Sequence, residues 1–75
     1  MSLPARVRAR VRAIRILEQA TGADHDTASN ALEASGNRTP VALVMLAAAV
    51  NRSRAVAALE KSKGHVRQAI AFAKH

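Results

Sequence analysis

The chain has 75 residues, a formal net charge of +7 and no cysteine, which fits one small domain and excludes a disulfide framework or a thiolate metal site. The apolar fraction of 49% is enough for a folded core, and the commonest residue is alanine, the strongest helix former. The sequence has neither an apolar run of membrane-spanning length nor a secretory signal, so we expect a cytoplasmic protein without a membrane partner.

The first helix is predicted over residues 4–21, and we interpret residues 1–3 as an added leader. Pro4 suits the first turn, where its missing backbone N–H leaves no donor unpaired. Gly22 is expected to end the helix in the left-handed conformation that favours glycine. At about 100° per residue, the face that should be buried carries Leu3, Val7, Ile14 and Leu17, with Ala13 at its edge.

The second and third predicted helices lie in the middle of the chain. The second spans residues 26–35, with Asp24 as an N-cap whose side chain can accept from a free backbone N–H. The third begins with Thr39 as N-cap and Pro40 in the first turn, and it runs to about Val50. It is apolar on nearly all sides, which is typical of a buried central helix.

The fourth and fifth predicted helices repeat the second and third. The fourth spans residues 53–61 with Asn51 as its N-cap, and the fifth begins at Val66. The repeat matches Ala28-x-x-Ala31-Leu32-Glu33-x-Ser35 with Ala55-x-x-Ala58-Leu59-Glu60-x-Ser62, and Ala42-Leu43-x-Met45 with Ala69-Ile70-x-Phe72. Met45 and Phe72 are expected to pack in the core at equivalent positions.

These elements predict one all-α domain over residues 1–75, a small bundle of about five short helices. After the N-terminal helix, residues 24–50 and 51–75 should form two helix-turn-helix units. Neither unit can bury its apolar stripe alone, so they are expected to pack on each other and on the first helix. The first unit reads A-x-x-A-L-x-x-S-G-N and then A-L-V-M, and it resembles the last two helices of ubiquitin-associated-type domains.

A longer match resembles the C-terminal helical domain of the bacterial N-acetylmuramic acid 6-phosphate etherases and covers roughly residues 6–70. The matching segments include Arg12-Ala13-Ile14-Arg15-Ile16-Leu17, Ala20-Thr21-Gly22-Ala23-Asp24, Ala42-Leu43-Val44-Met45-Leu46 and Gly64-His65-Val66-Arg67-Gln68-Ala69-Ile70. This resemblance implies that the parent enzyme cleaves the D-lactyl ether of N-acetylmuramic acid 6-phosphate during cell-wall amino-sugar recycling. The chemistry would belong to a preceding sugar-isomerase-type α/β domain, in an enzyme that is usually a homodimer and needs no metal.

The same resemblance implies the role of the present chain. It would be a non-catalytic accessory domain, without a cofactor of its own, that braces or caps the absent catalytic domain. The family often begins this domain with Asn-x-Lys-Leu-x-x-Arg, near the sugar-phosphate site. The corresponding positions here are Arg6, Arg8, Ala9 and Arg12, so the Lys is replaced by Arg and the Asn and Leu are lost.

Arg8, Arg12 and Arg15 form the sharpest candidate site because they share one stripe of the first helix. Like charges one turn apart repel, so an anionic partner would relieve a cost. That partner could be a sugar phosphate held by a bidentate guanidinium, an acidic face of the catalytic domain, or a nucleic-acid backbone. A solvated basic face is the plain alternative.

No catalytic residue and no metal site is predicted among the other polar side chains. The three histidines, His25, His65 and His75, are expected at the surface near helix ends. Glu33 and Glu60 occupy equivalent repeat positions and should face solvent.

The alternative function is a stand-alone basic module that binds nucleic acid or a protein partner. The net charge and the helix-turn-helix units favour nucleic acid. A single aromatic residue, however, offers no stacking platform, and the segment 41–50 is too apolar to read base edges. The composition therefore disfavours nucleic acid.

Overall fold

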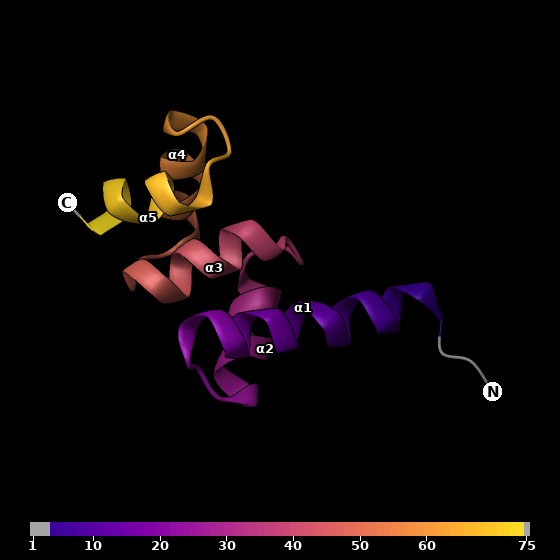
Figure 1. Cartoon of the computed structure of the whole chain (residues 1–75). Helices are drawn as coiled ribbons and strands as arrows, with labels where there is room; N and C mark the ends of the chain where they lie inside the picture. The colour runs from indigo at the N-terminus through magenta and orange to yellow at the C-terminus, as the bar shows by residue number, and fades with distance from the viewer. Residues whose placement is uncertain (1–3, 75) are drawn as a thin grey trace.

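The computed structural model describes residues 4–74, so the expected leader, with Leu3, and His75 lie outside the described residues. Within that range the chain forms five helices and no strand, which confirms the prediction of a small all-α bundle. The helices are α1 (Ala5–Thr21), α2 (His25–Ala34), α3 (Thr39–Ala48), α4 (Arg52–Lys61) and α5 (Val66–Lys74) (Figure 1). The ubiquitin-associated-like detail and the assignment of units to residues 24–50 and 51–75 stay predictions.

The centre of the molecule is α3, which contacts each of the other four helices (Figure 1). One face of α3 closes a first core with α1 and α2, and another face closes a second core with α4 and α5. The first core buries Ala13, Ile14, Leu17, Ala28, Ala31, Leu32 and Ala42. The second core buries Val41, Val44, Ala55, Ala58, Leu59, Ala69 and Ala73. Two opposed cores explain why α3 is apolar on nearly all sides.

The two inter-helix turns, α2 to α3 and α4 to α5, are built alike. The hydroxyls of Ser35 and Ser62 are buried and donate to the carbonyls of Leu32 and Leu59, at 2.7 and 3.1 Å. The next two residues of each turn, 36–37 and 63–64, have positive φ. Each turn contains one glycine, but at different positions, so Asn37 and Lys63 adopt the left-handed conformation that glycine would accept more easily.

The starts of α2 and α4 are also equivalent. The side chain of Asp24 accepts a hydrogen bond from the backbone N–H of Thr27 at 2.8 Å, and that of Asn51 accepts from Arg54 at 2.9 Å. Both predicted N-caps are thereby confirmed. Each pairs one of the N–H groups that the first turn of a helix leaves free.

The structure extends the 27-residue period back into α1. Ile14 and Leu17 of α1 fill the first core as Val41 and Val44 of α3 fill the second. Both helices end in a left-handed residue, Gly22 (φ 75°) and Ala49 (φ 55°). The helix pair α1–α2 is thus repeated by α3–α4, and α5 corresponds to the first helix of this pair.

Three local expectations were wrong. Val7 is 40% exposed, because α1 extends beyond the helices that would cover it. Phe72 is 43% exposed, because no helix within residues 4–74 covers this face of α5. Lys61 Nζ lies 5.0 Å from the centre of its ring. Thr39 is already helical, and the N-cap position belongs to Arg38, whose side chain makes no capping hydrogen bond.

Several helix ends also differ from the prediction by one or two residues, as fraying ends commonly do. The helix α3 ends at Ala48, not at Val50, because Ala49 turns into the left-handed conformation. Pro4 precedes the first helical residue of α1 as its N-cap. No single helix among residues 4–74 is both long and apolar enough to cross a membrane, and the pair α3–α4 reaches that length only with a bend of 107°.

The Asp24 cap gives a pH prediction. Hydrogen bonds from Thr27 hold the pKa of the Asp24 carboxyl below its ordinary value of 3.8. Because the pKa is lower in the folded state, the ionised Asp24 cap stabilises the fold above pH 3.8. This stabilisation is lost as the pH falls through the folded-state pKa. The Asp24→Asn variant keeps the acceptor but does not titrate. The gap between the thermal midpoints of wild type and variant should therefore narrow in acid, and a gap independent of pH would contradict this assignment.

Candidate functional site

The N-terminal half of α1 projects from the bundle (Figure 1). Residues 4–9 are all exposed, and the buried residues of α1 begin only at Ala13. The molecule measures 46 × 22 × 17 Å, so this projection accounts for much of its length.

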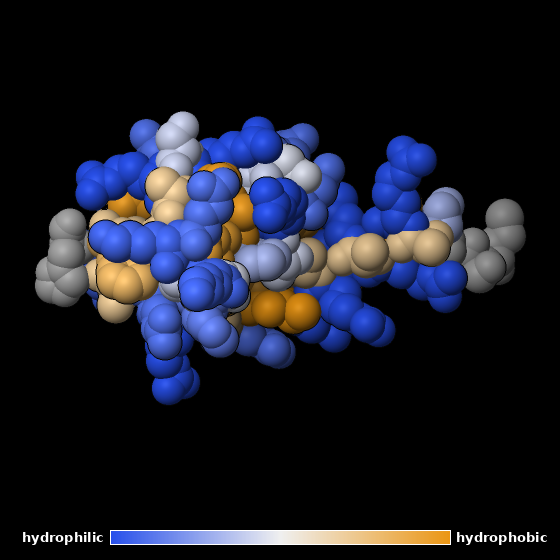
Figure 2. Space-filling model, turned by 90° about the horizontal axis from the view of Figure 1, so that it is seen from above, coloured by the Kyte–Doolittle hydropathy of each residue, from blue (hydrophilic) through white to orange (hydrophobic). Residues whose placement is uncertain are grey.

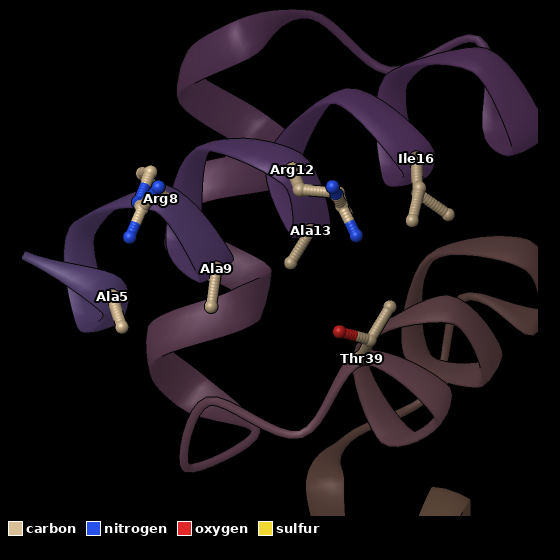
Figure 3. Close-up of a pocket in the computed structure, with 7 residues that line it drawn as sticks. All are labelled: Ala5, Arg8, Ala9, Arg12, Ala13, Ile16 and Thr39. Carbon is tan, nitrogen blue, oxygen red and sulfur yellow. The ribbon is translucent and has the colours of Figure 1, made fainter. Parts of the chain in front are cut away.

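Arg8, Arg12 and Arg15 lie together on this helix, as predicted, and all three are exposed. With Val11, they line a shallow depression on the side of α1 opposite to the core. Arg8 and Arg12 also border a groove that runs towards the start of α3 (Figure 3). The floor of this groove is formed by Ala5, Ala9 and Ala13, and it closes with Ile16 and Thr39.

A second groove adjoins the first along the same helix. It shares Ala9, Ala13 and Thr39 with the first groove, and its other side is formed by Arg6, Arg10, Leu32 and Asn37. The cavities of the two grooves measure about 350 and 360 Å³. In Figure 2 a pale strip runs along the projecting helix between hydrophilic side chains on both sides. We call this combined feature the alanine groove, defined by Ala5, Ala9 and Ala13 with its arginine rims.

Arg10 is the residue that the sequence analysis missed. Its Nη1 donates to Asn37 Oδ1 at 3.2 Å and its Nη2 donates to Ser29 Oγ at 3.1 Å. One guanidinium therefore joins α1 to α2 and to the turn before α3, and its orientation is fixed. The signal was present, because Arg10 falls on the same helical face as Ile14 and Leu17 and so points towards the bundle.

The charge of the projecting helix is one-sided. Arginines occupy positions 6, 8, 10, 12 and 15, and the first acidic residue is Glu18. The first turn of α1 has no acidic residue, and its N-cap, Pro4, makes no side-chain hydrogen bond. Positive charge near a helix N-terminus opposes the helix dipole. This half of α1 thus concentrates positive charge at the N-terminal end of the helix.

The acidic and imidazole groups lie elsewhere. Glu18 Oε1 is 3.4 Å from Nδ1 of His25 at the junction of α1 and α2, and Asp24 is the cap of α2. Glu33 and Glu60 are exposed, as expected from their repeat positions, and His65 is exposed before α5. No group of three His, Cys, Asp or Glu side chains within the described part of the chain could hold a metal ion.

Comparison with known proteins identifies relatives of this chain. It is 42% identical over 59 residues to N-acetylmuramic acid 6-phosphate etherase of Colwellia psychrerythraea, which covers 79% of this chain and 19% of the relative. It is 39% identical over 61 residues to N-acetylmuramic acid 6-phosphate etherase 1 of Bacillus licheniformis, a match that covers 81% of this chain and 20% of that relative. The enzyme of the same name from Deinococcus radiodurans is 42% identical over 59 residues, covering 79% and 19%.

The chain thus spans about a fifth of the length of these relatives. No family model matches the chain, and no solved structure matches it. Over about four fifths of its own length, the chain is related to the N-acetylmuramic acid 6-phosphate etherases and corresponds to their C-terminal region.

Proposed function

We propose that this chain is a non-catalytic accessory domain of an N-acetylmuramic acid 6-phosphate etherase, and that it braces or caps a sugar-isomerase-type catalytic domain. The observation that carries the proposal is the match of about four fifths of this chain to only about a fifth of each etherase. The distribution of acidic groups supports it, because the carboxylates of Asp24 and Glu18 are engaged in a cap and with His25.

The arginine stripe gives the proposed domain its means of acting on the catalytic domain. Arg8, Arg12 and Arg15 are exposed on a helix that already projects away from the bundle (Figure 1). A guanidinium can hold a phosphate or carboxylate through two parallel hydrogen bonds. We propose that this stripe contacts either the sugar phosphate or an acidic face beside it.

The test is a full-length chimera. The C-terminal region of the Colwellia psychrerythraea enzyme is replaced by this chain, and a second protein lacks that region altogether. Loss of a positioning element commonly costs large factors in rate, so we expect the deletion to lower kcat/KM for N-acetylmuramic acid 6-phosphate by at least about tenfold. The chimera should recover most of that loss. A chimera no better than the deletion would contradict the proposal.

The variants Arg8→Ala, Arg12→Ala and Arg15→Ala of the chimera distinguish contact with the sugar phosphate from contact with an acidic face of the catalytic domain. Removing a charge-assisted hydrogen bond to the substrate phosphate should lower kcat/KM about tenfold or more. An interdomain contact should instead weaken the docking of the domain, seen as an earlier thermal transition. Arg67→Ala on α5 is the matched control, because Arg67 is exposed and lies outside the stripe. Unchanged values for all three stripe variants would leave the arginines as a solvated face.

A further inference from the structure

The alanine groove, with arginines on both of its rims, is the surface feature whose chemistry best defines a partner. Its floor consists of small side chains at every fourth residue of α1, Ala5, Ala9 and Ala13, so another helix could approach closely along it. A basic groove between Arg38 and Arg52 also contains the carboxylate-bearing Glu60, and the basic depression beside Arg54 and Lys61 is smaller, at about 190 Å³. The alanine groove is lined by no acidic residue.

The rims set the charge of the partner. Arg6 and Arg10 stand on one side of the floor, and Arg8 and Arg12 stand on the other. The two arginines of each pair lie one helical turn apart on the same side of the groove, so their positive charges repel each other. Carboxylates spaced one turn apart on a partner helix would face both pairs. They would also interact favourably with the positive end of the helix dipole at the start of α1, where the N-cap makes no side-chain hydrogen bond.

The floor sets the chemical class of the partner. Phosphates alone would be attracted by the rims, but the floor offers methyl groups and no row of hydrogen-bond donors. Ile16, which closes the groove, is also exposed, at 43%. An apolar strip flanked by charge fits an amphipathic helix better than a sugar or a nucleic-acid backbone.

A second copy of this chain does not meet these requirements. The chain carries only five acidic residues against twelve basic ones. Asp24 caps α2 and Glu18 lies beside His25, so two of the five are already engaged. Two copies with a net charge of +7 each would repel.

We therefore propose that the alanine groove receives an acidic amphipathic helix of the etherase catalytic domain, with carboxylates one turn apart on both flanks of its apolar stripe. This inference rests on the proposed function and specifies the surface through which the domain acts. Arg10, held by Asn37 and Ser29, fixes one rim in advance. The partner helix would then meet a guanidinium that is already oriented.

The experiment measures amide hydrogen exchange of the α1 segment in two proteins, this chain alone and the full-length chimera. Docking should slow exchange over residues 5–12 by about tenfold or more in the chimera, because a packed helix opens less often. Charge reversal with Arg6→Glu and Arg8→Glu together should abolish that slowing, and so should Ala9→Phe, which fills the floor. The matched controls on α5, Arg67→Glu and Ala71→Phe, should leave it intact.

Each outcome decides one of the two proposals. An active chimera with an unprotected α1 would overturn the groove inference and leave the proposed function standing. Slowed exchange of α1 in a chimera that is no more active than the deletion protein would overturn the proposed function and leave the groove inference standing. Protection of α1 in the chain alone by duplex DNA at physiological salt, without protection in the chimera, would overturn the groove inference in favour of a nucleic-acid partner.

Discussion

Replacing Leu17 by Ala is expected to lower the free energy of unfolding by about 3 kcal/mol, a typical cost for deleting a fully buried leucine side chain. Leu17 is 0% exposed in the first core, between α2 and α3. A domain of this size has a small stability reserve, so the variant should be partly unfolded at room temperature. Urea titration followed by far-UV circular dichroism measures the change. Val11→Ala, on the exposed side of the same helix, should change stability by less than about 0.5 kcal/mol.

The same variant tests whether the two cores are one cooperative unit. Because α3 contributes to both cores, loss of the first core should remove the platform on which α4 and α5 pack. We therefore expect the amides of α5 to lose exchange protection by the same factor as those of α2. If α5 kept its full protection in the Leu17→Ala protein, the second core would be an independent folding unit.

Enlarging Ala42 to Leu is expected to cost about 2 to 3 kcal/mol, because the extra carbons have no space between α3 and the α1–α2 pair. Ala42 is 0% exposed in the first core, and its repeat equivalent, Ala69, is 0% exposed in the second. Ala69→Leu should therefore have a similar effect. Thermal denaturation of both variants measures it, with Ala71→Leu on the exposed side of α5 as the control. Wild-type stability of Ala42→Leu would show that the helices do not meet as closely as the structure places them.

Most of the fold could be predicted from local signals. The Asp24 and Asn51 caps, the left-handed Gly22 and the repeated Ala-x-x-Ala-Leu pattern all act within one or two turns of the chain. Such signals depend on hydrogen bonds and sterics that the neighbouring residues decide. The all-round apolar character of α3 also indicated its central place, because only a helix with partners on several sides benefits from it.

The wrong predictions of burial concern places where one helix extends beyond the helices packed against it. Periodicity assigned Val7 to the buried face correctly in angle, but α1 has 17 residues whereas α2 and α3 have ten each. Helical periodicity predicts the direction in which a side chain points, but it does not predict whether a neighbouring helix is long enough to cover that side chain. The same reasoning applies to Phe72, which matches Met45 in position but is not covered by another helix within residues 4–74.

The candidate site was predictable in part. The stripe of Arg8, Arg12 and Arg15 follows from helical spacing alone. The anchoring of Arg10 requires knowing that Ser29 and Asn37 come within reach of α1. The alanine groove likewise depends on the position of Thr39 at the start of α3, which only the packing of the chain determines.

The 27-residue period has a consequence for the length of such a molecule. Each α3-like helix presents one face to the pair before it and another to the pair after it, as Ala42 and Val44 do on α3. A further copy of residues 39–65, inserted after residue 65, would therefore add one helix pair and one more core without altering either end. Lengthening by whole repeats would preserve the fold, whereas inserting a single residue within a helix would rotate the apolar face that follows it by about 100°, away from its partner.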